Sequence, residues 1–213
     1  LAWQRAIADG MDTRRFDAEI RLNRPEPQDA LLARVGAIPG VTAVEGWSLS
    51  EADPIRAEAF EIRRTYPDGG HGSFLLRGTP PDSQLVQLPV LSGRWLTGGD
   101  SDGIVLNHLA VAQLTGVGVG DSVQLTVEGR TNTWQVVGIV REIGAPATAY
   151  VTGTAFAQAQ SMNGEANALR VVIASDDPAQ RGAVMRAIEQ SLGVGGISVA
   201  SVITDTELRL AVD

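Results

Sequence analysis

Hydrophobic and polar positions alternate along this chain with two different periods. Residues 16–22 carry an apolar side chain at every second position, with charged side chains between them, which predicts a half-buried strand. Pro25 and Pro27 are then expected to break the chain, and residues 28–35 repeat apolar side chains at helical spacing. Residues 41–49 return to a strand pattern. Strand, helix and strand in this order make half of a split βαβ arrangement, as in ferredoxin-like folds.

The far end of the chain repeats the same order of elements. Residues 169–173 read as a strand, and Asp177 followed by Pro178 is the signal for a helix N-cap with proline in the first turn. The helix is expected to end at Gly193, and residues 197–203 form the next strand. The two halves of the arrangement therefore lie at opposite ends of the sequence. The long segment between them is predicted to be an insertion.

The first part of the middle segment is predicted to contain short strands. Residues 59–65 and 74–79 alternate around a polar loop at residues 66–72. An apolar strand follows at residues 104–106. A helix with apolar positions between residues 109 and 114 comes next and stops at Gly116.

The second part of the middle segment reads as two strands joined by a tight turn. Val119-Gly120-Asp121 leads into residues 123–127, where apolar and polar side chains alternate. Glu128-Gly129-Arg130 turns the chain back, and residues 134–140 form the partner strand. The tripeptide Gly93-Arg94-Trp95 precedes these two strands, and it also precedes the strand at residues 104–106.

The order of these features between residues 88 and 142 resembles the central part of the MacB-like periplasmic domain of FtsX-like ABC transporter permeases. The resemblance implies an α+β fold: a porter-like split βαβ (ferredoxin-like) lobe from residues 1–82 and 166–213, and an inserted β-rich Sabre-like lobe from residues 86–163. The residues that carry the family motif, expected to be structural, are Gly93, Arg94, Trp95, Gly120 and Asp121.

The function implied by the resemblance is that of a non-catalytic, extracytoplasmic domain of a permease subunit in the cytoplasmic (inner) membrane. ATP hydrolysis in a separate cytoplasmic ATPase subunit would move this domain, which would then act on a substrate or partner outside the membrane. A second permease copy or homologue and an extracytoplasmic protein or lipoprotein are the further partners implied. The class includes exporters, lipoprotein extractors and regulators of cell-wall hydrolases, and the residue pattern does not choose among them.

The amino-acid composition excludes several kinds of binding partner and catalytic site. The 213 residues carry a net charge of −8, which argues against nucleic acid as a partner. All 17 basic residues are arginine, so the chain lacks the lysine of a phosphate-binding loop and cannot be the ATPase. It also has no cysteine, which excludes thiolate nucleophiles, thiolate metal sites and disulfides. No cofactor, metal site or catalytic residue is expected.

Few residues suggest a reactive site. His71 lies in a polar loop, and His108 is expected to play a local capping role at the start of a helix. Residues 100–103, Asp-Ser-Asp-Gly, lack a ligand and a preceding helix for a calcium loop, so a turn is favoured. The glycines between residues 116 and 120 follow a helix and precede a strand, the reverse of a phosphate-binding loop. Two other hypotheses stay open: a free-standing extracytoplasmic binding module and a hydrolase with a carboxylate site.

Nothing in the sequence approaches the ~20 apolar residues that span a bilayer, and no signal-peptide pattern is present. Together with the resemblance, this predicts that the chain is an excised part of a longer permease. Residues 204–207 fit a capping box at a helix start, and residues 1–7 are an apolar helical segment. Both are expected to be severed stalk helices that lie side by side and point at the membrane.

Overall fold

The computed structural model describes residues 13–55, 73–114 and 116–204. The expectations for His71, the loop at 66–72, the strand at 59–65 and both stalk helices fall outside the described residues. The α+β class is confirmed. The chain divides into two compact units. The first unit consists of Leu1–Ser48, Asp82–Gln87 and Met162–Asp213, and the second of Leu49–Pro81 and Leu88–Ser161.

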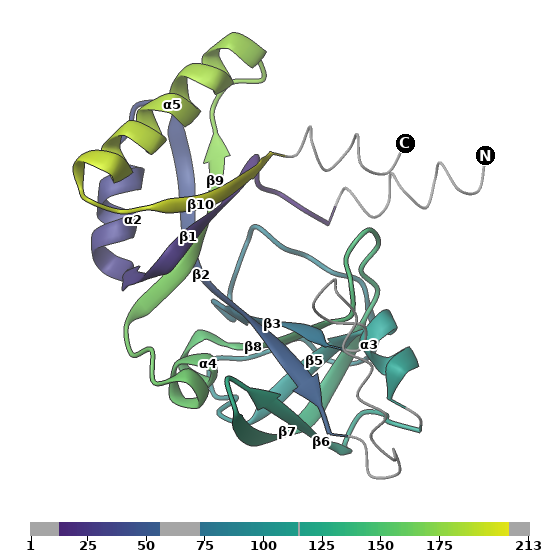
Figure 1. Ribbon diagram of the computed structural model, residues 1–213. Helices are drawn as coiled ribbons and strands as arrows, with labels where there is room; N and C mark the ends of the chain where they lie inside the picture. Colours follow the sequence, from purple (N-terminus) through teal and green to yellow (C-terminus); the bar gives the residue numbers. More distant parts are fainter. Residues whose placement is uncertain (1–12, 56–72, 115, 205–213) are drawn as a thin grey trace, which may run out of the picture. The chain divides into compact units, whose positions relative to one another are not determined.

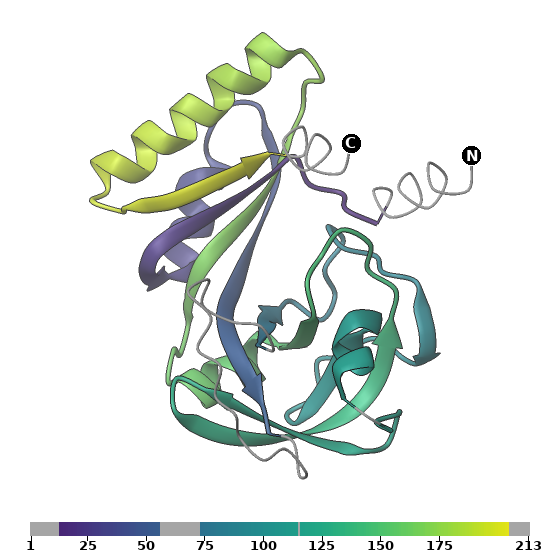
Figure 2. The ribbon, with the colours of Figure 1, turned by 45° about the vertical axis from the view of Figure 1, so that its right-hand side comes forward.

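Over the described residues, the first unit is a four-stranded antiparallel sheet with two helices. Its elements are β1 (Ala18–Pro27), α2 (Gln28–Gly36), β2 (Val41–Pro54), β9 (Glu165–Ile173), α5 (Pro178–Val194) and β10 (Val199–Thr204). The strand order is β10-β1-β9-β2, and every neighbouring pair is antiparallel. Since β9 lies between β1 and β2, the β1-α2-β2 unit is split by a strand from the far end of the sequence. Figures 1 and 2 show α2 and α5 on the same face of this sheet.

Alternation along the strands sends one set of apolar side chains toward those helices. Ile20 and Leu22 of β1 and Leu169 and Val171 of β9 are buried in the cluster that the helices cover. The helices contribute buried side chains from their inner faces, namely Leu31, Val35, Ile188 and Leu192. The N-cap of α5 is confirmed, because the Asp177 carboxylate accepts a hydrogen bond from the Gln180 amide at 2.8 Å.

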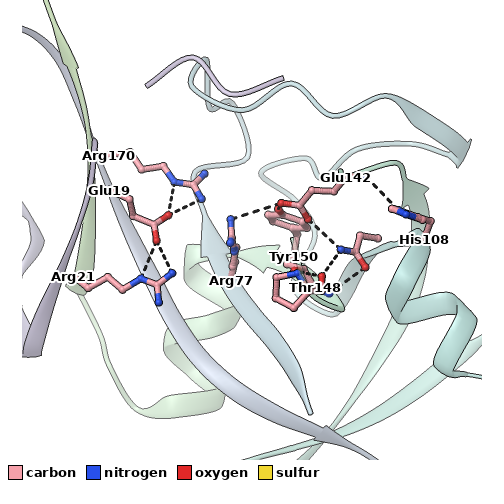
Figure 3. Close-up of polar contacts among 10 residues, drawn as sticks. Glu19, Arg21, Arg77, His108, Glu142, Thr148, Tyr150 and Arg170 are labelled. Atoms are coloured by element: carbon pink, nitrogen blue, oxygen red, sulfur yellow. Dashed lines mark hydrogen bonds and ion pairs between the residues drawn. The ribbon is translucent and has the colours of Figure 1, made fainter. Parts of the chain in front are cut away.

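The opposite face of the sheet carries a buried arginine. Arg170 of β9, with 1% of its surface exposed, lies between two aromatic rings: its guanidinium carbon is 3.6 Å from the Trp47 ring centre and 4.5 Å from that of Phe16. Its Nε and Nη2 donate to Glu19 Oε2 at 3.1 and 3.0 Å. Glu19 Oε1 in turn accepts from Arg21 at 2.9 Å (Figure 3). Charge pairing and ring stacking thus join β1, β9 and β2.

The second unit is β-rich and mixed. Its elements are β3 (Phe74–Thr79), β4 (Val90–Gly93), β5 (Gly103–Asn107), α3 (His108–Gln113), β6 (Ser122–Val127), β7 (Arg130–Val140), β8 (Thr148–Thr152) and α4 (Gly153–Gln160). Pairing continues from the second half of β2 in the order β2-β3-β8-β5-β7-β4, and β6 pairs with both β2 and β7. The β3–β8 and β5–β7 pairs are parallel. All five residues of β5 are buried, as expected for a central strand.

Several boundaries differ from the sequence prediction. Pro25 and Pro27 do not end the strand, because β1 shifts register against β9 between Arg21 and Glu26 and so accommodates both prolines. The second strand runs to Pro54 because its far end pairs with β6. The helix α5 ends at Val194, one residue after the predicted Gly193. The strands β4 and β8 and the helix α4 were not predicted.

Residues 49–81 fall in the second unit, whereas the sequence pattern grouped them with the first. The reason is pairing that the local pattern does not encode: β3 forms a parallel ladder with β8, from Leu75 opposite Thr148 to Thr79 opposite Thr152. Parallel pairing needs a distant partner strand, and nothing within residues 74–79 identifies it.

The buried ion pair gives a stability prediction. Arg170→Met should lower the free energy of unfolding by about 3 kcal/mol, because it leaves the buried Glu19 carboxylate with one partner fewer and removes the cation between the rings. Arg21→Met is the matched control. Its side chain is 36% exposed, so a loss of about 1 kcal/mol or less is expected. Urea denaturation at neutral pH measures both values, and equal losses would contradict the assignment.

Candidate functional site

The site is built around β7, which changes its hydrogen-bonding partner partway along its length. Its first half, Arg130–Gln135, pairs with β6, and its last residues, Gly138–Val140, pair with β4. Val136 and Val137 lie between these two ladders. Their backbone groups therefore need other partners on this edge, since buried peptide groups are almost always hydrogen-bonded.

The predicted motif residues supply these partners. The Gly120 amide donates to Val136 O at 2.8 Å, and the Val136 amide donates to Asp121 O at 2.9 Å. The Arg94 amide donates to Val137 O at 3.0 Å. The structure thus brings the Gly-Arg-Trp segment and the Val-Gly-Asp turn together on one stretch of β7, although Arg94 and Gly120 are 26 positions apart in the sequence.

Close backbone approach explains two glycines at this point. Gly93 has φ +70°, and a Cβ there would lie 2.3 Å from Val137 O. A Cβ on Gly138 would lie 1.9 Å from Arg94 O, far inside van der Waals contact. Both positions therefore exclude any side chain. Gly138 is a site residue that the sequence prediction did not single out.

The Val-Gly-Asp turn is fixed by its own hydrogen bonds. The Asp121 amide donates to Gly118 O at 3.2 Å, and the Asp121 carboxylate accepts from the Gly118 amide at 2.8 Å. Gly120 has φ +95°, a conformation that L side chains rarely adopt, although nothing lies within 4 Å of the place where its Cβ would be. Backbone conformation, not lack of space, requires glycine there.

Arg94 closes the loop that follows β4. Its Nη1 and Nη2 donate to the two carboxylate oxygens of Asp100, both at 2.7 Å, and Nη1 also donates to Trp95 O at 3.0 Å. The Thr97 amide and hydroxyl donate to the same carboxylate at 2.7 and 3.0 Å. These donors, Arg94 first, hold the pKa of Asp100 well below its usual range, and the pKa of Arg94 is raised. The Asp100 carboxylate thus accepts the hydrogen bonds that close the turn between Arg94 and Asp100.

Trp95 leads from this corner into a buried polar network. Its ring centre lies 5.2 Å from that of Tyr150, tilted by 54°. The Tyr150 hydroxyl donates to Glu142 Oε1 at 2.8 Å, and an Arg77 nitrogen lies 3.9 Å from the same oxygen (Figure 3). Tyr150 is fully buried and Glu142 is 3% exposed, so these contacts operate at low local dielectric.

Asn107 completes the network from the end of β5. Its amide nitrogen donates to Glu142 Oε2 at 3.2 Å and to Pro146 O at 2.7 Å. Its amide oxygen accepts from the Ala110 amide at 2.9 Å and from the Thr148 amide at 3.1 Å. One fully buried side chain thereby caps α3 and holds the chain before β8.

The capping role assigned to His108 was therefore wrong: Asn107 is the cap, because its side chain accepts the hydrogen bond from the third residue after it. His108 Nδ1 instead accepts from the Glu142 amide at 3.4 Å. A short polar side chain between an apolar strand and a helix is a readable cap signal. Glu142, which accepts from Asn107, and Tyr150, which donates to Glu142, carry no such signal, since they lie 35 and 43 positions after Asn107 in the sequence.

Two further observations concern the described residues only. No group of three or more His, Cys, Asp or Glu side chains among them could hold a metal ion. No helix in the described ranges combines the length and apolar character needed to cross a membrane.

The fold matches those of solved structures of transporter domains. The extracellular domain of the noncanonic ABC-type transporter YknZ from Gram-positive bacteria aligns with a TM-score of 0.58 at 13% identity, over 87% of this chain and 99% of that one. The periplasmic region of MacB from Actinobacillus actinomycetemcomitans aligns with a TM-score of 0.57 at 11% identity, over 97% of both chains.

The resemblance to MacB-like periplasmic domains is thus confirmed at the level of the fold: the chain folds like the extracytoplasmic domains of MacB- and YknZ-like ABC transporter permeases. No protein-family model matches the chain, and no curated protein matches it.

The backbone crossing gives one prediction. Gly138→Ala should destabilise the protein by about 3 kcal/mol or more, because the new methyl group collides with Arg94 O, a backbone atom that cannot rotate away. Gly99→Ala is the control, since nothing lies within 4 Å of its Cβ position and a change within about 0.5 kcal/mol is expected. Thermal unfolding compares the two, and a stable Gly138→Ala protein would contradict the crossing.

The Arg94–Asp100 pair gives a pH prediction. Because folding lowers the pKa of Asp100, the pair contributes stability above the unfolded-state pKa of about 4 and loses it as the pH falls further. Asp100→Asn should therefore cost about 1 kcal/mol at pH 7, a modest value because the Arg94 side chain is 49% exposed. The difference from the unmodified protein should shrink below pH 4 and in 1 M NaCl. A pH-independent difference would mean that the charge is not responsible.

Proposed function

We propose that this chain is the extracytoplasmic domain of an ABC transporter permease subunit of the MacB/FtsX kind. The observation that carries the proposal is the extent of the structural likeness. It covers 87% and 97% of this chain and 99% and 97% of the two neighbours, so whole domain matches whole domain. A chance likeness in one supersecondary motif would leave most of each chain unmatched.

Within this proposal, the two units correspond to two lobes. The first unit, with its split βαβ sheet from both parts of the sequence, is the porter-like lobe, and the second, β-rich unit is the inserted Sabre-like lobe. The proposed lobes keep the discontinuous plan predicted from the sequence but move residues 49–81 into the inserted lobe. The motif residues around β7 then have a structural role inside that lobe.

The proposed domain is non-catalytic. The chain contains no lysine and no cysteine, and the conspicuous carboxylate of Asp100 accepts hydrogen bonds on both oxygens from Arg94. Its contribution is mechanical: motion driven by ATP hydrolysis in a cytoplasmic ATPase subunit reaches this domain through membrane helices and moves or engages a substrate or partner outside. A second permease copy or homologue completes the transporter, and an extracytoplasmic protein or lipoprotein is the further partner.

The proposal is tested by finding on which side of the cytoplasmic membrane the chain lies. A single introduced cysteine can report this, because the chain itself contains no cysteine. Ser101→Cys, at an exposed turn position, is introduced into the full-length protein with all cysteines outside residues 1–213 replaced by serine. In cells whose outer barrier admits small reagents, a maleimide that does not cross the cytoplasmic membrane should label it fully, and the protein should sediment with membranes.

Two controls frame this experiment. The same protein without Ser101→Cys should stay unlabelled, and Leu106→Cys, at a fully buried position, should be labelled only after denaturation. Labelling of Ser101→Cys only after the cytoplasmic membrane is permeabilised would refute the extracytoplasmic location. Full labelling of a protein that does not sediment with membranes would favour a free-standing binding module instead.

A further inference from the structure

The segment Asp82–Gln87 belongs to the first unit, although the residues on both sides of it belong to the second. The chain also passes between the units after Ser48 and after Ser161. Those two connections are continuous backbone and cannot open. The segment Asp82–Gln87, here called the strap, is held to the first unit only by non-covalent contacts, and it connects β3 to β4 of the second unit.

The strap lies beside the start of the described chain. The Arg15 amide donates to Leu85 O at 2.9 Å, and the Gln87 amide donates to Thr13 O at 3.0 Å. Between these bonds, Arg14 and Val86 form an isolated antiparallel bridge. This is a ladder of two backbone hydrogen bonds, far shorter than the ladders that hold β1 to β9 and β10.

A carboxylate of β2 holds the other end of the strap. Glu45 Oε2 accepts from the Ser83 hydroxyl at 2.6 Å, and Oε1 accepts from the Gln84 amide at 3.1 Å. The Trp47 indole also donates to Oε2 at 3.1 Å, which orients the carboxylate toward the strap. The Ser83 hydroxyl oxygen accepts from the Leu85 amide at 3.2 Å, so one polar cluster fixes the first half of the strap.

The docked strap is well packed but small. Leu85 and Val86 are 5% and 6% exposed, which opposes spontaneous opening. The hydrogen bonds described above between the strap and Thr13–Arg15 and Glu45 lie outside the β1–β9 ladder, so they can break without disturbing it. Local openings of this kind have free energies below that of global unfolding.

We propose that the strap is a releasable connection: it undocks from Thr13–Arg15 and Glu45 as one event, independently of β1 and β9. Undocking leaves the six residues of the strap, up to about 20 Å of extended chain, free to move. Glu45 controls the opening. This inference goes beyond the proposed function and does not depend on it, since the opening is a property of this chain by itself.

Amide hydrogen exchange of the chain, followed by NMR, measures the opening. The Arg15 and Gln87 amides should exchange at the same opening free energy, and faster than hydrogen-bonded amides in the middle of β1 and β9. Glu45→Gln should accelerate both about tenfold, because an amide cannot accept from three donors as the carboxylate does; this factor corresponds to about 1.4 kcal/mol. Glu51→Gln, at an exposed position of the same strand, should leave both rates unchanged.

A disulfide supplies the converse test. The two ladder bonds flank the Arg14–Val86 pair, which places its Cα atoms about 4.5 Å apart, within disulfide range. Oxidised Arg14→Cys/Val86→Cys should exchange at Arg15 and Gln87 at least tenfold more slowly than the same protein after reduction. The reduced form of this double variant is its own control.

Three results would overturn the proposal. Exchange of Arg15 and Gln87 only at the rate of the β1 core would mean that the strap opens with the whole unit. Unequal opening free energies at the two amides would mean that it does not move as one element. An unchanged rate in Glu45→Gln would remove Glu45 as the controlling group.

Discussion

The first unit depends on a single buried arginine, because that residue joins strands from segments far apart in the sequence. Arg170 reaches Glu19 and stacks between Phe16 and Trp47, which come from the N-terminal part of the chain. Burying a guanidinium is unfavourable unless its charge and its donors are matched. Glu19 provides the charge and the two rings provide polarizable faces. The sheet therefore assembles with the β9 strand in one register, since a shift by one residue would turn Arg170 into the apolar face covered by α2 and α5.

The second unit is governed by a different constraint, namely that the backbone groups of β7 need hydrogen-bond partners along its whole length. When β7 passes from β6 to β4, two of its residues lack a strand partner on that edge, and two loops provide the missing donors and acceptor. Loops can reach that close only if side chains are absent at the contact, which Gly93 and Gly138 ensure. The Arg94 side chain pairs with Asp100 of the same loop at the surface. Side-chain charge organises the first unit, whereas main-chain hydrogen bonding organises this corner of the second.

These two constraints also separate what the sequence could predict from what it could not. Local signals were sufficient for the Asp177 cap, for the alternating strands and for the motif glycine Gly120, because the period of hydrophobicity and the demand for positive φ act within a few residues. The parallel β3–β8 ladder could not be predicted, and neither could the Glu142–Tyr150 contact, because both join residues whose neighbours in the sequence carry no trace of the partner. The role of Gly138 could not be predicted for the same reason: glycine is required there because the backbone of Arg94, 44 positions earlier, lies against it.

The same distinction bears on how far structural likeness carries function. Strand pairing, positive φ at turns and close backbone crossings can be met by many sequences, so a shared fold at 11% to 13% identity is physically reasonable. Such constraints fix where elements lie and say nothing about which partner an exposed side chain meets. Gly93, Gly120 and Gly138 have a positive φ or a close backbone contact, so substitutions there are expected to disturb folding. Under the proposed function, recognition of a substrate or partner would therefore reside in exposed side chains that the fold does not constrain. In the proposed opening, the strap parts from Thr13–Arg15 and Glu45 while the Arg170 cluster stays closed, because that cluster lies within the continuous β1–β9 ladder.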